Sequence, residues 1–305
     1  MTFLIVIYHK KIISNYQFYH RKRVNMKYDY HIHTFYCKHS DLTVNEIVQE
    51  YFKNNFIEIG ISDHIPYKGD LDSKDNSRMY YKELESYIND IKIEQEKYQN
   101  KLKINIGFES EFFSSQIQWY KELLSRKEVD YLILGIHAVE NLDEENNFNR
   151  NCTNKEQLKR YWKAINEGMR SGLFAYAVHP DFYMKSYQEW DDECDELANK
   201  ICDLANELDF PLGFNINGIW KGPRQIGKVF RNKYPIHEFW KIAKKKNVKI
   251  ILESDVHHKK QLYDTEIISK TYSLIKEWGL EEQLVSKLDL EKYKKNLNIK
   301  YNLGK

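Results

Sequence analysis

Short apolar runs alternate with longer amphipathic stretches along most of this chain, from Met26 onward. The apolar runs are rich in β-branched and aromatic residues, as buried strands are. They predict seven strands, at residues 28–33, 56–62, 103–109, 131–137, 174–179, 212–217 and 248–254. The stretches between them repeat apolar residues every three or four positions, which predicts helices. These helices are expected at residues 44–53, 80–98, 116–127, 155–171, 194–208 and 236–246, and from 266 to about 294.

This alternation predicts one α/β domain over residues 26–305. Strands separated by helices of ten or more residues pair in parallel through right-handed crossovers. Seven such units fit a barrel better than an open sheet, and no linker rich in Gly, Pro or Ser interrupts them. Residues 1–25 lack the alternation and end in the basic cluster Arg21-Lys22-Arg23. We expect them to be an N-terminal extension, either poorly ordered or the product of a start codon placed too early.

Composition excludes several classes of partner and compartment. The 305 residues carry a net charge of +2, which gives no reason to expect nucleic acid as the main partner. No apolar stretch approaches the roughly 20 residues of a membrane span. The four cysteines contain no Cys-x-x-Cys pair, which argues against a disulfide framework. We therefore expect a cytoplasmic protein, and the sequence leaves its oligomeric state open.

Histidines and carboxylates stand at the downstream ends of most predicted strands. His31 and His33 are two residues apart, so both can face one ion from the end of a strand, and Asp255 and His257 repeat that spacing. Parallel strands bring such ends together at one rim. Imidazole and carboxylate are ordinary ligands of zinc, iron and manganese. The pattern therefore predicts a multinuclear metal centre.

The same residues resemble the PHP (polymerase and histidinol phosphatase) family. The resemblance rests on Tyr28-Asp29-Tyr30-His31-Ile32-His33, His39, Ser62-Asp63-His64, Gly107-Phe108-Glu109, His137, His179-Pro180 and Ser254-Asp255-Val256-His257, in order. It implies a distorted (β/α)7 TIM-like barrel with a trinuclear site at its C-terminal rim. The implied metal ligands are His31, His33, His39, His64, Glu109, His137, His179, Asp255 and His257.

The resemblance also implies how three divalent ions (Zn, Mn or Fe) share these ligands. One ion takes His31, His33, Glu109 and Asp255. Glu109 bridges to a second ion held by His137 and His179, and His39, His64 and His257 hold a third. The implied reaction is hydrolysis of a small phosphate monoester by a metal-bound hydroxide, with Glu109, Asp255 and His257 as catalytic residues.

Within the family, the chain is most similar to histidinol-phosphate phosphatases, which implies conversion of L-histidinol phosphate to L-histidinol and phosphate in histidine biosynthesis. That branch commonly has an arginine two residues after the glycine that corresponds to Gly218, where this chain has Trp220. A cation is needed there for the phosphate, and Arg224, then Lys221, are the expected replacements. The role of Trp220 stays open.

Other interpretations remain. A nuclease or phosphodiesterase with the same metals, a phosphatase for another small monoester, and a binding protein without activity are the alternatives. The segment Gly222 to Lys228 approaches a phosphate-binding P-loop, but Val229 replaces the Ser or Thr that such a loop requires.

Four further residues flank the expected ligands. Asp63 and Asp181 are candidates to orient imidazoles, and capping a helix is an equal alternative for Asp63. Glu111 either faces the site or ends its strand in solvent. Cys37 is expected to have a buried apolar role rather than to approach the metals.

Overall fold

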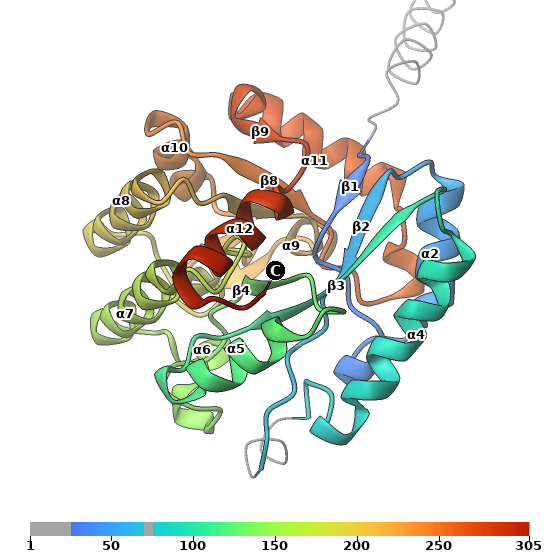
Figure 1. Cartoon of the computed structure of the whole chain (residues 1–305). Coiled ribbons are helices and arrows are strands. Elements are labelled where there is room, and N and C mark those ends of the chain that lie inside the picture. Colours follow the sequence, from blue (N-terminus) through green and yellow to red (C-terminus); the bar gives the residue numbers. More distant parts are fainter. Residues whose placement is uncertain (1–25, 70–75, 305) are drawn as a thin grey trace, which may run out of the picture.

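A ring of parallel strands surrounded by helices forms the molecule (Figure 1). The structure, a computed structural model, describes residues 26–69 and 76–304. The expected N-terminal extension, residues 1–25, lies outside the described residues. The strands are β1 (Tyr28–Asp29), β2 (Glu58–Ile61), β3 (Lys103–Ser110), β4 (Tyr131–Leu134), β5 (Leu212–Asn215), β8 (Ile250–Glu253) and β9 (Leu284–Val285).

Parallel pairing follows the order β1-β2-β3-β4 in one sheet and β5-β8-β9 in another. Residues 174–179, expected to form a strand, join the two sheets through single bridges from Ala177 to Leu134 and Leu212. On the other side of the ring, a bridge between Ile32 and Val256 connects the segments that follow β1 and β8. The seven predicted strand segments therefore occur in the predicted ring, but the ladder at residues 174–179 is too short to count as a strand.

Most helices lie where the periodicity places them. They are α2 (Val44–Lys53), α4 (Leu84–Lys97), α5 (Ile117–Ser125), α6 (Phe148–Asn151), α7 (Lys155–Ser171), α8 (Asp192–Glu207), α9 (Ile216–Trp220), α10 (His237–Lys245), α11 (Thr265–Glu277) and α12 (Leu290–Tyr301). None of the described helices is long and apolar enough to cross a membrane.

The last helical region, expected from residue 266 to about 294, is divided into two helices by a short strand. Gly279 adopts a φ of 67°, which ends the helical path after α11. The chain then forms β9, which pairs with β8, before α12 begins. The Tyr293 hydroxyl in α12 donates to the carbonyl of Leu173 at 2.6 Å, so α12 covers the end of the barrel where the strands start.

The hydrophobic pattern also did not predict the short elements between β5 and α10. The expected strand at residues 212–217 ends at Asn215, whose side chain accepts a hydrogen bond from the Gly218 N–H and caps α9. An antiparallel hairpin of β6 (Arg224–Ile226) and β7 (Val229–Arg231) follows. These elements span too few residues to show a hydrophobic period.

The inside of the barrel is filled by side chains beneath the site. A Cβ atom built on Gly60 would lie 2.0 Å from the Tyr131 hydroxyl, and one on Gly107 would lie 2.4 Å from the same ring. These two glycines therefore leave the space that the Tyr131 ring occupies. Its hydroxyl donates to the carbonyl of Tyr30 at 2.8 Å. The barrel is consequently a closed core with its chemistry at the rim.

Candidate metal centre

The predicted ligands gather around one cavity at the carboxyl ends of the strands. His31 and His33 follow β1, His64 follows β2, and Glu109 lies near the end of β3. His137, His179, Asp255 and His257 follow the remaining segments of the ring, and His39 follows the short helix Phe35–Cys37. The cavity measures about 300 Å³, and His39, His64, Glu109, His137, His179, Asp255 and His257 line it. His31 and His33 lie beneath them, fully buried.

Four donor atoms converge at the base of the cavity. The Nε2 atoms of His31 and His33 are 3.0 Å apart, and each lies 3.3 Å from Glu109 Oε2. Asp255 Oδ1 is 3.7 Å from His31 Nε2 and 3.5 Å from His33 Nε2. Ligand atoms at about 2.05 Å from a tetrahedral zinc ion lie about 3.3 Å from one another. The four atoms are therefore spaced as the ligands of one small cation are.

The second carboxylate oxygen of Glu109 faces a different pair of histidines. Its Oε1 lies 3.1 Å from His179 Nε2 and 3.2 Å from His137 Nε2. These two imidazole nitrogens are 3.3 Å apart. Glu109 thus places one oxygen on each side, which is the arrangement that a bridging ligand needs.

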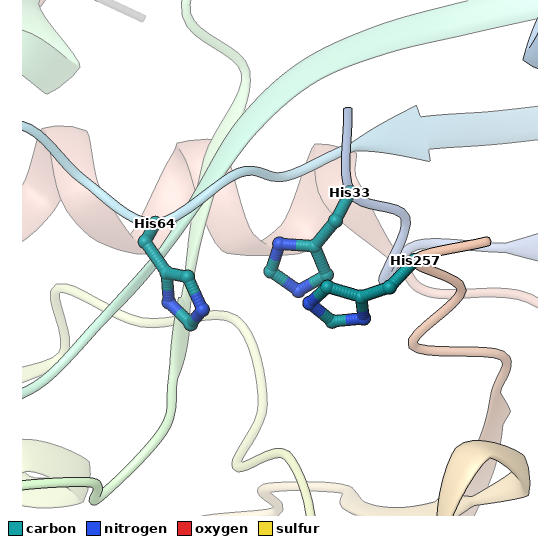
Figure 2. A group of neighbouring side chains, drawn as sticks. All are labelled: His33, His64 and His257. Carbon is teal, nitrogen blue, oxygen red and sulfur yellow. The ribbon is translucent and has the colours of Figure 1, made fainter. Parts of the chain in front are cut away.

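A third group of imidazoles lies on the outer side of His33. Ligand atoms of His33, His64 and His257 all lie within 4.8 Å of one another, and Figure 2 shows these rings brought together from three chain segments. The His39 and His257 rings are stacked, with centroids 4.5 Å apart. The structure therefore brings together the expected set of His39, His64 and His257, and it adds His33 beside them.

The histidines in this third group fit a cation rather than another hydrogen bond. His257 Nδ1 lies 2.9 Å from the carbonyl oxygen of Asp255, so it carries the hydrogen and donates it. Its buried Nε2 then presents a lone pair with no hydrogen-bond partner among the described residues. Burial also holds the pKa of His257 and of His64 well below the usual value. Both are therefore neutral near pH 7, the form that binds metal ions.

The charges at the base of the cavity also favour a cation site. Burial lowers the pKa of His31, but the negative charges of Glu109, Asp255 and Glu253 outweigh burial and raise it to about 10. Burial raises the pKa of Glu109, but the surrounding histidines, first His137 and His31, bring it well below its usual value. The buried carboxylates therefore draw positive charge into the cluster. The histidine and carboxylate clusters of this chain suit divalent metal ions.

A match to a known family accompanies this geometry. Residues 29–217 match the model of the PHP domain. The chain belongs to the PHP domain family. This confirms the resemblance seen in the sequence.

Curated relatives carry consistent names. This PHP protein is 26% identical over 233 residues to the probable histidinol-phosphatase of Deinococcus radiodurans, covering 75% of this chain and 85% of the relative. It is 24% identical over 257 residues to the histidinol-phosphatase of Bacillus subtilis, covering 76% and 93%.

Solved structures share the fold and confirm the predicted fold class. The putative histidinol phosphatase of Listeria monocytogenes superimposes with a TM-score of 0.63 at 20% identity, covering 78% of this chain and 98% of that one. Histidinol phosphate phosphatase from Lactococcus lactis, solved with zinc, L-histidinol and phosphate, gives a TM-score of 0.62 at 19% identity, covering 83% and 94%.

Only one of the two expected phosphate-binding residues of this PHP protein lines the cavity. Lys221 lines the cavity. Arg224 is exposed at the start of β6 and is not among the described residues that line the cavity. Its guanidinium donates a hydrogen bond to the Lys221 carbonyl at 3.3 Å. Trp220 lines a small separate pocket with Tyr51 and Ser254 instead. The arginine expected near Gly218 therefore has no counterpart at Trp220, and the predicted role of Arg224 stays untested.

Lys185 also lines the cavity, although no pattern in the sequence singles it out. It ends the short helix Phe182–Lys185 after His179, and its ammonium lies 4.8 Å from the centre of the Phe182 ring. Burial, then the neighbouring Lys221 and Lys233, lower the pKa of Lys185 to about 7. A lysine on a single short turn of helix has no hydrophobic periodicity that would reveal it.

The four residues flanking the ligands have different surroundings. Asp63 accepts from the N–H of Thr34 at 2.9 Å and lies 3.4 Å from His33 Nδ1, which favours the orienting role. Asp181 instead accepts from the N–H of Ile236 at 2.7 Å.

Glu111 is buried and faces the site, 3.3 Å from His137 Nδ1 and 3.1 Å from the Arg78 guanidinium. Cys37 is buried as expected, but its sulfur also lies within 4.8 Å of ligand atoms of His39 and His257.

Proposed function

We propose that this PHP protein is a metal-dependent phosphatase that hydrolyses L-histidinol phosphate to L-histidinol and phosphate. The observation that carries the proposal is Glu109, whose two oxygens face two separate histidine groups within 3.3 Å at the base of a cavity. The names of the relatives, and the L-histidinol and phosphate bound by the Lactococcus lactis protein, support the choice of substrate.

We further propose three divalent ions, zinc, manganese or iron, held by the nine predicted ligands. His31, His33, Glu109 and Asp255 hold the first, Glu109, His137 and His179 the second, and His39, His64 and His257 the third. Such ions neutralise the phosphate charge and lower the pKa of water toward neutrality. The three groups of donors described above support this division.

Residues of the chain itself hold the reacting groups in place. Asp255 Oδ2 accepts hydrogen bonds from the side-chain amides of Asn215 at 3.1 Å and Asn217 at 2.9 Å, which fix the carboxylate. In the proposed reaction, water adds to phosphorus, the ester P–O bond breaks, and the departing alkoxide takes up a proton. Lys185 and Lys221 stand at the cavity wall to hold the phosphate oxygens.

The cavity suits a small substrate with a flat organic group. Its volume of about 300 Å³ is at the lower end of ligand sites. Phe182 and Tyr234 line it, with ring centroids 5.5 Å apart, and present apolar faces. An imidazole ring can pack against such a wall. The same size and the near-neutral charge of the chain disfavour the nuclease alternative.

We also propose that the protein acts in histidine biosynthesis in the cytoplasm. The four cysteines are free and buried, which accords with a reducing compartment.

A panel of three substrates tests the choice. Phosphate release from L-histidinol phosphate should exceed release from an unrelated sugar phosphate, and a phosphodiester such as bis(p-nitrophenyl) phosphate should react slowest. Faster cleavage of the diester or of single-stranded DNA would favour the nuclease alternative. Equal rates on all monoesters would contradict histidinol phosphate as the specific substrate.

The low pKa of Lys185 predicts a limb in the pH profile. With a pKa of about 7, Lys185 is a cation below pH 7 and loses its charge as the pH rises through that value. We therefore expect kcat/KM to fall above pH 7 in the wild-type protein. Lys185→Met should lower kcat/KM about tenfold at pH 6.5, since one charge-assisted hydrogen bond contributes about 1.5 kcal/mol, and should flatten this limb.

Lys185→Arg serves as the matched control, because it keeps the charge at all these pH values. It should retain activity and move the limb to higher pH. A Lys185→Met profile identical in shape to that of the wild type would contradict the role of Lys185.

A further inference from the structure

Glu253, the last residue of β8, is a fully buried carboxylate that the ligand pattern does not include. Its side chain points into the barrel, directly beneath the proposed metal centre, where it contacts His31 and the backbone of His179. An ionised carboxylate in a protein interior requires hydrogen bonds or opposite charge around it.

Three segments of the ring meet at this carboxylate. Glu253 Oε2 lies 3.2 Å from His31 Nδ1. Its Oε1 accepts a hydrogen bond from the backbone N–H of His179 at 2.9 Å and one from the side-chain amide of Asn215 at 3.1 Å. The same amide nitrogen lies 3.1 Å from Asp255 Oδ2. Glu253 therefore connects to three predicted ligands without belonging to the ligand set.

The contact with His31 fixes which ring nitrogen carries the hydrogen. A carboxylate only accepts, so His31 Nδ1 is the donor. In neutral His31, Nε2 then presents its lone pair toward Glu109 Oε2 and His33 Nε2, where the first ion is proposed.

The contact with His179 stabilises an unfavourable backbone conformation at that residue. His179 has a φ of 30°, a value that residues other than glycine adopt only when their surroundings enforce it. The hydrogen bond from its N–H to Glu253 helps to hold this conformation. It thereby sets the direction in which the His179 ring leaves the chain.

Gly213 leaves the space that Glu253 fills. A Cβ atom built on Gly213 in β5 would lie 2.5 Å from Glu253 Oε2 and 2.6 Å from its carboxyl carbon. Contacts under 3 Å force a shift, and here the displaced atoms are the end of the glutamate side chain. A methyl group at this position would push the carboxylate away from His31. The substitution would not change any of the predicted metal ligands.

We propose that Glu253 is a positioning residue that holds His31, His179 and Asp255 in place and so couples the first two ion positions. The inference rests on the proposed metal-dependent function. Carboxylates behind metal-binding histidines typically contribute 10- to 100-fold in metal affinity.

Glu253→Gln tests the proposal through metal affinity, measured by competition with a chromophoric chelator. Glutamine keeps the size of the side chain, but its NH₂ group must face His31 Nδ1–H or the N–H of His179, where an acceptor is needed. We expect zinc or manganese affinity to fall about 10- to 100-fold. Glu253→Asp, which keeps the charge, should recover part of that loss.

Gly213→Ala is the second variant, because it displaces the carboxylate without removing it. It should weaken metal binding in the same direction, and it decides the question if Glu253→Gln does not fold. Glu58→Gln is the matched control. Glu58 is also a buried strand glutamate, but it starts β2 and accepts from Asn105 at 3.0 Å, at the opposite end of the barrel. Its replacement should lower thermal stability and leave metal affinity unchanged.

The wild-type protein separates the two possible failures. If the wild type binds no divalent metal, the proposed function itself fails. If the wild type binds metal and both Glu253→Gln and Gly213→Ala bind it equally tightly, only the role of Glu253 is overturned. A loss of affinity in these two variants but not in Glu58→Gln supports it.

Discussion

Replacing Glu109 with glutamine is expected to reduce kcat/KM for L-histidinol phosphate about 10³-fold, or about 4 kcal/mol of transition-state stabilisation. Glu109 is buried, and its two oxygens lie within 3.3 Å of His31, His33, His137 and His179. Glutamine has nearly the same shape but lacks the charge. Its NH₂ group would also face imidazole nitrogens that are needed as metal ligands. Steady-state kinetics with metal analysis of the purified variant measure the effect.

Glu94→Gln is the control for this prediction. Glu94 is a buried glutamate of α4 that accepts from Asn45 at 2.7 Å, away from the metal centre. Its replacement should leave kcat/KM within a factor of two or three. If a Glu109→Gln variant retained its metal ions and also its activity, the proposal that Glu109 bridges two metal ions would be wrong.

Removing the metal ions is expected to lower the unfolding temperature and to abolish activity. An ion present at 100 times its Kd stabilises the folded state by about 2.7 kcal/mol, which corresponds to a shift of roughly 5 °C in a chain of this size. Dialysis against a chelator followed by a thermal melt measures the shift. Adding zinc or manganese back should restore both properties.

The same binding should release protons. In the metal-free protein the carboxylates raise the pKa of His31 to about 10, so His31 is protonated at pH 8. A metal ion must displace that proton, and metal affinity should fall as the pH is lowered. Calorimetry in two buffers of different ionisation enthalpy counts the protons. An unchanged melting temperature on metal addition, or binding without proton release at pH 8, would contradict this account of the cluster.

The rim of ligands could be predicted because its signal is periodic. Parallel strands end at the same edge of the barrel, so the sequence alone predicts that His64 after β2 and His137 after β4 lie near one another. The crowding of His33 against His257 was not predictable. β1 ends at Asp29, and the directions of His31 and His33 depend on the extended chain beyond it, where Ile32 bridges to Val256.

The other residues around the site gave weaker signals in the sequence. Glu253 lies in the apolar run 248–254, and the only signal for its role was that a charged residue interrupts a run expected to be buried. Lys185 and Arg224 belong to a short helix and a short hairpin, which span too few residues to show a hydrophobic period. The division of the last helix had a local signal in Gly279, but the amphipathic pattern continues on both sides of it.

The most direct measurement is phosphate release from L-histidinol phosphate by metal-free protein as zinc or manganese is added stepwise. The account predicts no release without metal, a rise in rate with each ion bound, and a plateau when the histidine and carboxylate ligands are filled. The same rate in metal-free protein, or no release from protein shown to hold its metal ions, would contradict it.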